Sequence, residues 1–267
     1  MKKIAKHSPS LLNGPLLDAI RVKSLSPADT NQYPFSLNII KNLRDIHFPS
    51  QVTFFIGENG TGKSTLLEAI AAHAGFGAEG GSKNISFKTS ADDAYSGTKN
   101  LADYLTLSWR HKPQDGYFFR AETFYNVANY LDYLERECGG KAYGPYGGKS
   151  LHHQSHGESF LAFFKNRVNK GGFFIFDEPE AALSPQRQLS LLVIINQLCK
   201  DFNTQFIIAT HSPIFLAYPE ATIYSCDGDH LKKVNYIETA HYRITKDFLN
   251  NPELYLQKLL YEQPDTP

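Results

Sequence analysis

The sequence predicts an α/β fold built on a mostly parallel central sheet. The segment 52–56 consists of five strand-forming residues without polar alternation, which is typical of a strand covered on both faces. Two further apolar segments, 173–176 and 205–209, alternate with helical stretches along the chain. Strands that alternate with helices pack as a parallel sheet with right-handed crossovers.

A short antiparallel part is expected to lead into this sheet. We expect strands at 19–22 and 35–40, separated by a loop rich in Pro, Asp and Asn. The apolar positions after Lys63 have helical spacing and stop before Gly75. A strand, a glycine loop and a helix therefore follow one another, which is half of a βαβ unit.

Residues 77–157 differ in character from the rest of the chain. Stretches rich in Gly, Ser and Asn surround a strand-like segment at 116–120 and a helical segment at 126–137. We interpret 77–157 as a smaller, mainly helical lobe inserted into a single domain that spans 1–267. After it, the pattern predicts helices at about 157–169 and 185–199, a hairpin of 222–226 with 231–236, and a terminal helix at 246–261.

Composition and charge restrict the classes of protein. Lys plus Arg and Asp plus Glu both number 27, so the net charge is zero and no global field attracts nucleic acid or anionic lipid. Three cysteines without a CxxC pair fit neither a disulfide framework nor a zinc knuckle. No apolar run approaches the roughly 20 residues of a membrane helix, and no signal-peptide stretch follows the basic N-terminus. We therefore expect a soluble, cytoplasmic protein without an integral membrane segment.

The strongest motif is a glycine-rich loop between the strand at 52–56 and the helix after it. The residues that match the pattern GxxxxGK[ST] are Gly57, Glu58, Asn59, Gly60, Thr61, Gly62, Lys63 and Ser64, and Thr65 completes the expected nucleotide site. Glycines let backbone N–H groups converge on phosphates, and the helix N-terminus adds the positive end of its dipole. We expect Lys63 to neutralise the β- and γ-phosphate oxygens and Ser64 to ligate Mg²⁺, which makes ATP and Mg²⁺ the predicted ligands.

Two carboxylates, Asp177 and Glu178, follow the apolar segment 173–176. Open parallel sheets bind their ligands at the carboxyl ends of the strands. Asp177 can hold Mg²⁺ through water, and Glu178 can polarise the water that attacks the γ-phosphate. The alternative is a turn with solvated acids, which the neighbouring phosphate loop disfavours.

Two other motifs are weak when each is taken alone. The segment 155–159 precedes a predicted helix, where Ser and Gly usually form only an N-cap. His211 follows the strand at 205–209 and could reach a γ-phosphate, although a lone histidine there is more often a packing or capping residue.

In this order the motifs resemble those of the ATP-binding-cassette (ABC) type of P-loop ATPase. Segment 57–64 resembles Walker A, 155–159 a variant of the LSGGQ signature, 177–178 Walker B with its catalytic glutamate, 181–184 the D-loop, and His211 the switch histidine. Within this family, GENGTGKSTLLEAIA, SHGESF, DEPEAALSPQRQL and FIIATHSP are most similar to small stand-alone ATPases related to the chromosome-maintenance and recombination-repair branch. The resemblance covers nearly the whole chain and implies a P-loop NTPase fold of the ABC-ATPase type. It makes Lys63, Glu178 and His211 the expected catalytic residues.

The signature-like segment departs from the family pattern. His156 stands where the family usually has glycine, and Glu158 and Ser159 replace its glycine-glutamine end. Ser155 and Gly157 keep a hydroxyl and a close backbone approach, so we expect these two residues to contact a γ-phosphate.

Two further family features lack a clear counterpart. No glutamine of the Q-loop type follows 116–120, and Glu122 is expected to take its metal-facing role beside Ser64 and Asp177. Tyr33 or Phe35 could stack on adenine, but on an aromatic-rich chain the core or surface interpretation is favoured for both.

The resemblance also implies a mechanism and a partner. One subunit holds ATP and Mg²⁺, and the partner's Ser155–Gly157 loop closes on the γ-phosphate, so the protein is expected to form a homodimer on ATP binding. We expect an ATPase that acts as a dimerisation switch coupled to nucleic acid or an effector protein, in repair or phage defence by analogy. The alternative is the motor subunit of a membrane ABC transporter, which the altered signature, the missing Q-loop glutamine and the lack of a fused membrane segment disfavour. A non-hydrolysing ATP-binding module is disfavoured because Glu178 is present.

Overall fold

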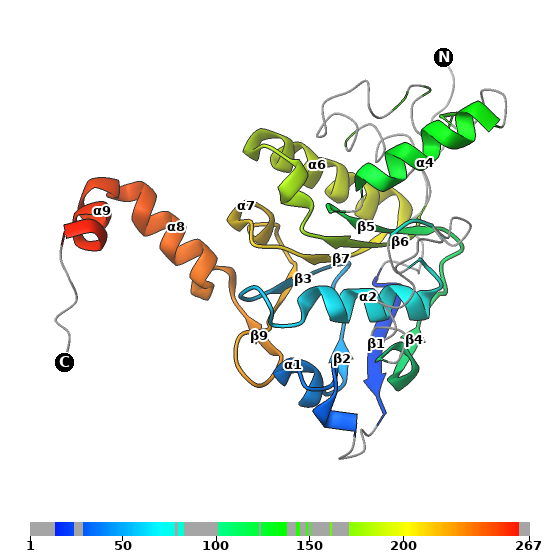
Figure 1. Cartoon of the computed structure of the whole chain (residues 1–267), viewed down its shortest axis with the longest axis horizontal. Coiled ribbons are helices and arrows are strands. Elements are labelled where there is room, and N and C mark those ends of the chain that lie inside the picture. Colours follow the sequence, from blue (N-terminus) through cyan, green and yellow to red (C-terminus); the bar gives the residue numbers. More distant parts are fainter. Residues whose placement is uncertain are drawn as a thin grey trace.

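The structure is a computed structural model that describes residues 14–23, 29–77, 80–82, 101–122, 124–137, 143–144, 148, 150, 161 and 171–261. These residues form two sheets with helices between and around them, and a helical arm that extends from the body (Figure 1).

Six strands form the central sheet, in the order β5-β6-β7-β3-β8-β9. They are β3 (Val52–Ile56), β5 (Gly116–Arg120), β6 (Phe173–Asp177), β7 (Gln205–Ala209), β8 (Thr222–Ser225) and β9 (Lys232–Val234). The first five in the sheet order are parallel, and β9 pairs with β8 as an antiparallel hairpin. The predicted α/β fold with a mostly parallel sheet is confirmed, and so is the late hairpin.

A second, antiparallel sheet has the order β2-β1-β4. Its strands are β1 (Leu17–Val22), β2 (Ile46–His47) and β4 (Leu105–Trp109). The buried side chain of Gln205 links the two sheets, because it accepts a hydrogen bond from the Leu17 N–H at 2.6 Å and donates one to the Leu17 carbonyl at 3.1 Å. The predicted antiparallel N-terminal part is thereby attached to the central sheet.

The predicted strand at 35–40 is wrong. This part of the chain contains a short helix, α1 (Asn38–Lys41), which follows the 3-10 turn η1 (Asp29–Asn31). Ile39 and Ile40 are both buried. Consecutive residues of a strand point to opposite faces, whereas a helical turn can direct both of these side chains into one core.

The helices of the body cover both faces of the central sheet. They are α2 (Lys63–Ala74), which lies between the two sheets, and α6 (Pro185–Phe202) and α7 (Pro213–Leu216) on the opposite face (Figure 1). Alternate residues of β3 divide the core: Phe55 packs on the α2 side, and Phe54 packs on the α6 side. The predicted end of α2 is confirmed, because Gly75 adopts a left-handed C-cap with φ 92°.

The segment predicted as an inserted lobe, 77–157, contains two strands that belong to the sheets. Strand β4 is part of the antiparallel sheet, and β5 is the edge strand of the central sheet. The predicted helix at 126–137 corresponds to α4 (Phe124–Glu137). Almost all of the predicted helix at 157–169 lies outside the described residues, and the division of the chain into a domain and a lobe stays a prediction.

The predicted terminal helix at 246–261 is wrong in its boundaries. After the turn η5 (Tyr236–Glu238), the chain forms two helices, α8 (Ala240–Asn250) and α9 (Pro252–Tyr261). The break occurs because Pro252 disfavours helical geometry at the residue before it, and Asn251 has φ −151° and ψ 66°. The start at residue 240 is set by Thr239, whose hydroxyl accepts a hydrogen bond from the Tyr242 N–H.

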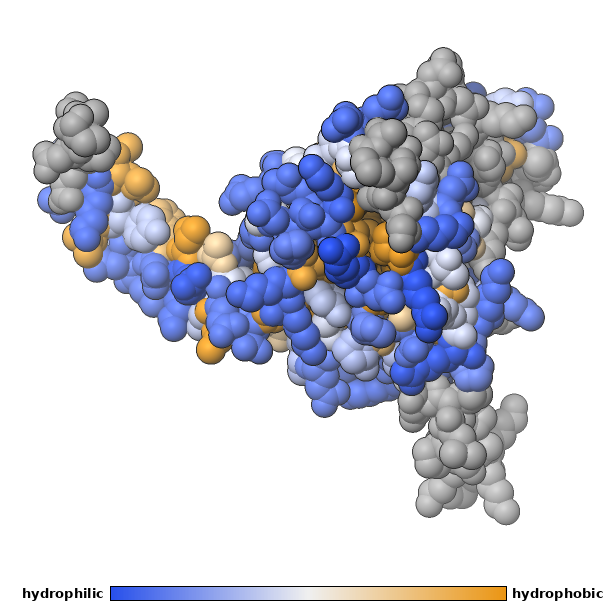
Figure 2. All heavy atoms as spheres, turned by 90° about the horizontal axis from the view of Figure 1, so that it is seen from below, coloured by the Kyte–Doolittle hydropathy of each residue, from blue (hydrophilic) through white to orange (hydrophobic). Residues whose placement is uncertain are grey.

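Helices α8 and α9 together form a C-terminal arm, residues 240–261, that projects away from the sheets (Figure 1). Figure 2 shows apolar residues gathered along this arm. The exposed apolar side chains of the arm are Ile244, Phe248, Leu249, Leu254, Leu256, Leu259, Leu260 and Tyr261. Among the described residues, no helix is both long enough and apolar enough to cross a membrane.

Candidate nucleotide-binding site

The glycine-rich loop connects the end of β3 to the start of α2. Gly57, Gly60 and Gly62 have φ angles of 145°, 83° and 99°, which side chains rarely permit. A Cβ on Gly57 would lie 3.0 Å from Oδ1 of Asp227 and 3.1 Å from Cβ of Cys226. Glycine is therefore required at position 57 for two reasons. Its backbone conformation disfavours other residues, and the residues that follow β8 leave no room for a side chain.

Lys63 is the first residue of α2 and lies beneath this loop. Its side chain is buried, and Nζ donates hydrogen bonds to the carbonyl of Gly57 at 2.6 Å and to that of Glu58 at 3.0 Å. Gly62, the N-cap of α2, provides no side-chain cap for the first N–H groups of the helix. An ammonium group and a helix N-terminus thus meet at one place, which is the arrangement that binds phosphate.

Asp227 contacts the glycine-rich loop from the turn after β8, a role that the sequence patterns did not indicate. Its Oδ1 accepts a hydrogen bond from the Glu58 N–H at 2.8 Å, and its Oδ2 accepts one from the Ser225 hydroxyl at 3.2 Å. In the sequence, Asp227-Gly228 resembles an ordinary hairpin turn. The parallel pairing of β8 with β3 brings this turn to the phosphate loop.

Asp177 and Ser64 meet where β6 ends and α2 begins. The Ser64 hydroxyl donates a hydrogen bond to Oδ1 of Asp177 at 3.1 Å. Burial raises the pKa of Asp177 to about 6, although the Arg120 guanidinium and the hydrogen bond from Ser64 oppose this rise. The predicted pair of magnesium ligands is therefore brought together, with a hydroxyl and a carboxylate oxygen in direct contact.

Arg120, at the end of β5, is a second component missed by the sequence analysis. Its buried side chain forms ion pairs with Glu68 at 2.8 Å and with Glu122, and its Nε lies 3.8 Å from Oδ2 of Asp177. The side chain of Glu122 is 65% exposed and lines the same cavity as Asp177. Arg120 thus holds Glu122 beside the Ser64–Asp177 pair.

Glu178 has an unusual backbone conformation. Its φ and ψ are 50° and 52°, in the left-handed region that non-glycine residues seldom occupy, and its N–H donates to the Ala209 carbonyl at 3.0 Å. The turn η4 (Pro179–Ala182) begins directly after it. This geometry directs the Glu178 carboxylate toward His211, whose Nε2 lies 3.6 Å from Oε1 of Glu178.

His211 follows β7 and is held by a second carboxylate. Its backbone N–H donates to Oε1 of Glu180 at 2.5 Å, and its Nδ1 lies 3.1 Å from Nε2 of His241. The pKa of His211 is lowered, chiefly by burial and also by the nearby Lys63 ammonium. The ring is therefore neutral near pH 7.

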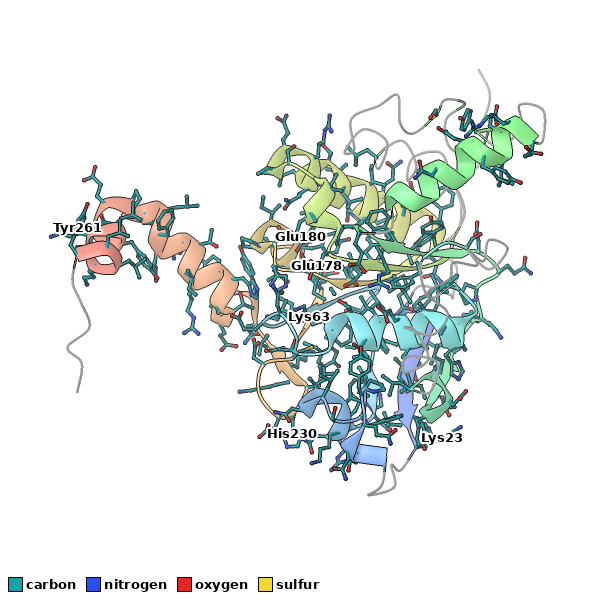
Figure 3. The ribbon with its side chains drawn as sticks, viewed as in Figure 1. Lys23, Lys63, Glu178, Glu180, His230 and Tyr261 are labelled. Carbon is teal, nitrogen blue, oxygen red and sulfur yellow. The ribbon has the colours of Figure 1, made fainter. Side chains whose placement is uncertain are left out.

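Part of this site borders a cavity of about 600 Å³. Its lining residues are Ser64, Arg120, Ala121, Glu122, Asp177, Glu178, Ala181 and Ala182. In Figure 3, Lys63, Glu178 and Glu180 lie at the same end of the central sheet. Two residues of the predicted D-loop, Ala181 and Ala182, complete one wall of the cavity.

Four further residues were predicted to contact the nucleotide or were considered for that role, and the structure describes two of them. Ser155 and Gly157 lie outside the described residues. The Tyr33 hydroxyl lies 3.0 Å from Oγ1 of Thr65, and its side chain is exposed beside the phosphate loop. Phe35, by contrast, is buried in the core against Tyr104, so of the two aromatic candidates only Tyr33 is accessible at this loop.

Two protein-family models match consecutive parts of the chain. An AAA domain model matches residues 35–158, and an AAA ATPase domain model matches residues 156–216. The matched segments include the glycine-rich loop, the two carboxylates at the end of β6 and His211. Both matches support the resemblance to P-loop ATPases of the ABC type that the sequence indicates. The fold predicted from the sequence is confirmed.

Solved structures that are similar to this chain share little sequence with it. An SMC head domain from Thermotoga maritima is 15% identical, with 82% of this chain and 98% of that chain covered and a TM-score of 0.43. A putative metal-chelate type ABC transporter in an inward-facing conformation is 16% identical, with 87% and 88% covered and a TM-score of 0.47. The protein cbiO1 from Clostridium perfringens, part of the ABC transporter complex cbiONQ, is 17% identical, with 90% and 97% covered and a TM-score of 0.46. No curated protein matches the sequence of this chain.

Proposed function

We propose that this protein binds ATP with Mg²⁺ in the described cavity and hydrolyses it to ADP and phosphate. The observation that carries the proposal is the convergence of Lys63, the Ser64–Asp177 pair and Glu178 at one end of the parallel sheet. An ammonium, a pair of oxygen ligands and a carboxylate base are the groups that phosphoryl transfer to water requires.

The donor set at Ser64 and Asp177 suits Mg²⁺. Magnesium binds through one or two protein oxygens and takes its remaining ligands from water and substrate phosphates. We propose Ser64 and Asp177 as the direct or water-mediated ligands, with Glu122 beside them; the bound ion would supply positive charge to the phosphate oxygens.

The chain's own residues account for the other steps. The N–H groups of the loop and the Lys63 ammonium would bind the β- and γ-phosphate oxygens and stabilise the charge that develops there. Glu178 would orient the attacking water and accept its proton, since its carboxylate is partly exposed to the cavity. His211, 3.6 Å from that carboxylate, would contact the γ-phosphate.

We also propose that ATP binding brings two copies of the chain together. The side chains of Glu178 and His211 are 42% and 32% exposed, so the site is open to solvent on one side. Hydrolysis sites work best when bulk water is excluded, and a second copy that places Ser155 and Gly157 over the γ-phosphate would exclude it. The cycle of closing and opening would act on nucleic acid or an effector protein, as the resemblance implies.

The test is the variant Glu178→Gln, which keeps the size of the side chain and removes its basicity. We expect it to bind ATP with Mg²⁺ in calorimetry while phosphate release falls by at least about 100-fold, the scale of general-base catalysis. His230→Ala, which changes an exposed side chain of the β8–β9 turn, is the control and should hydrolyse ATP normally. Normal phosphate release by Glu178→Gln would exclude Glu178 as the base.

A further inference from the structure

The contact between His211 and His241 joins the candidate site to the C-terminal arm. His241 lies in the first turn of α8, 30 residues after His211, and its Nε2 is 3.1 Å from Nδ1 of His211. The two rings are 5.3 Å apart between centroids and are inclined by 50°. This distance and these atoms identify a hydrogen bond between two imidazoles.

One ring of such a pair must donate and the other must accept. A neutral imidazole has one N–H donor and one acceptor nitrogen, whereas two imidazolium rings would direct N–H groups at each other. The pKa of each histidine is lowered, primarily by burial, so both rings are neutral near pH 7. The charged groups that act on the pair are Lys63 and Glu58 of the phosphate loop, Glu178 after β6 and Asp227 after β8.

The position of Glu178 decides which ring donates. Nε2 of His211 is 3.6 Å from Oε1 of Glu178 and, among the described residues, forms no hydrogen bond. An N–H at Nε2 would be attracted to this carboxylate, whereas a lone pair there would be repelled by it. With its proton on Nε2, His211 has only an acceptor at Nδ1, and the donor of the pair must then be the Nε2–H of His241.

We propose that His241 is a positioning residue for His211. Its Nε2–H donates to Nδ1 of His211 and holds that ring in the tautomer that directs an N–H toward Glu178 and the γ-phosphate. The claim that this N–H faces the γ-phosphate rests on the proposed function. The claim about the tautomer of His211 does not. Because His241 belongs to α8, the first turn of the C-terminal arm is bonded directly to the residue that faces the γ-phosphate.

The tautomer can be measured on the full chain without nucleotide, by ¹⁵N NMR of the imidazole nitrogens at pH 7.5 to 8. The variant His211→Gln identifies the signals of His211 by their loss. In the wild type we expect His211 to carry its proton on Nε2. In His241→Met, which keeps bulk and removes the donor, His211 should become a mixture of tautomers. In His241→Gln, whose amide can donate from nearly the same position, Nε2–H should persist.

Activity provides the second measurement. We expect His241→Met to lower kcat at least about tenfold with a smaller change in KM, because a wrong tautomer removes a donor from the reacting site. His241→Gln should restore most of that loss, and the matched histidine control His230→Ala should leave both kcat and the His211 spectrum unchanged.

A wild-type His211 with its proton on Nδ1, or a tautomer that stays the same in His241→Met, would overturn the proposal. An unchanged kcat in a His241→Met protein with an altered tautomer would overturn the positioning role. A wild type that hydrolyses no ATP would refute the proposed function instead, and the NMR comparison would still decide the tautomer.

Discussion

Oδ1 of Asp227 accepts a hydrogen bond from the backbone N–H of Glu58 across 169 residues of chain. The carboxylate comes from the turn after β8, and the N–H belongs to the phosphate loop after β3. The loop is therefore held in shape by a side chain from the turn after β8 as well as by its own glycines.

Removing this bond should loosen the loop before any phosphate contact is lost. We expect Asp227→Ala to weaken ATP binding about 3- to 10-fold, since an intramolecular hydrogen bond contributes about 0.5–1.5 kcal/mol net. Asp227→Asn retains the acceptor oxygen and should bind nearly as the wild type does. Asp229→Ala, an exposed position in the same turn, is the control, and calorimetry with equal losses in Asp227→Ala and Asp229→Ala would contradict the assignment.

Lys63→Ala should have a larger effect on the same measurement. The ammonium would be the charge partner of the phosphates, and its removal should lower ATP affinity by at least about tenfold, or 1.4 kcal/mol. Lys63 also bridges the carbonyls of Gly57 and Glu58, so circular dichroism must first establish that the variant is folded. Unchanged affinity in a folded variant would exclude the loop from nucleotide binding.

The Glu178→Gln protein should become a stable dimer in the presence of ATP and Mg²⁺. Without hydrolysis, each bound nucleotide continues to favour the closed dimer, and this linkage grows with ligand concentration. Light scattering should give twice the monomer mass with ATP and Mg²⁺ and not with ADP and Mg²⁺. A mass that does not respond to saturating ATP would refute the composite site even if the wild type hydrolyses ATP.

Two variants that are each inactive should complement each other if the signature acts across the dimer. Ser155→Arg should bind ATP and hydrolyse none, because the added side chain would block the partner's γ-phosphate. In a heterodimer with Lys63→Ala, one site combines an intact loop with an intact Ser155, so mixing should restore part of the activity. Verified heterodimers without any recovered hydrolysis would argue against contact in trans.

Asp177 should make the stability of the nucleotide-free protein depend on pH. Burial raises the pKa of Asp177 from 3.8 to about 6 in the folded state, so the folded protein holds this proton more tightly than the unfolded chain does. The contribution of Asp177 to stability is therefore greatest below about pH 4 and is lost as the pH rises to about 6.

The variant Asp177→Asn cannot ionise and removes this dependence. Its free energy of unfolding relative to the wild type should increase between pH 4 and pH 7 by up to about 3 kcal/mol, the equivalent of the pKa shift. Urea unfolding at the two pH values measures this change. Asp201→Asn, at an exposed position, should give no such difference, and the same absence in Asp177→Asn would contradict the buried-carboxylate interpretation.

Features carried by contiguous residues could be predicted from the sequence alone. These features are the phosphate loop, the two carboxylates at the end of β6, and the buried strands 52–56, 173–176 and 205–209. Each depends on local conformation or on apolar periodicity. The parallel arrangement followed from the alternation of strands and helices, since that order limits the ways in which the chain can pack. Together these patterns were sufficient to indicate the resemblance to P-loop ATPases of the ABC type.

Tertiary structure decided the features that depend on pairing between distant segments. Asp227, Arg120 and His241 join the site only because β8, β5 and α8 are placed beside the phosphate loop, β6 and β7. Segment 35–40, although rich in strand formers, contains a helical turn because that turn buries two consecutive isoleucines in one core. Local propensity amounts to tenths of a kcal/mol per residue, whereas burying such a side chain contributes about 1.5–3 kcal/mol, so packing overrides it.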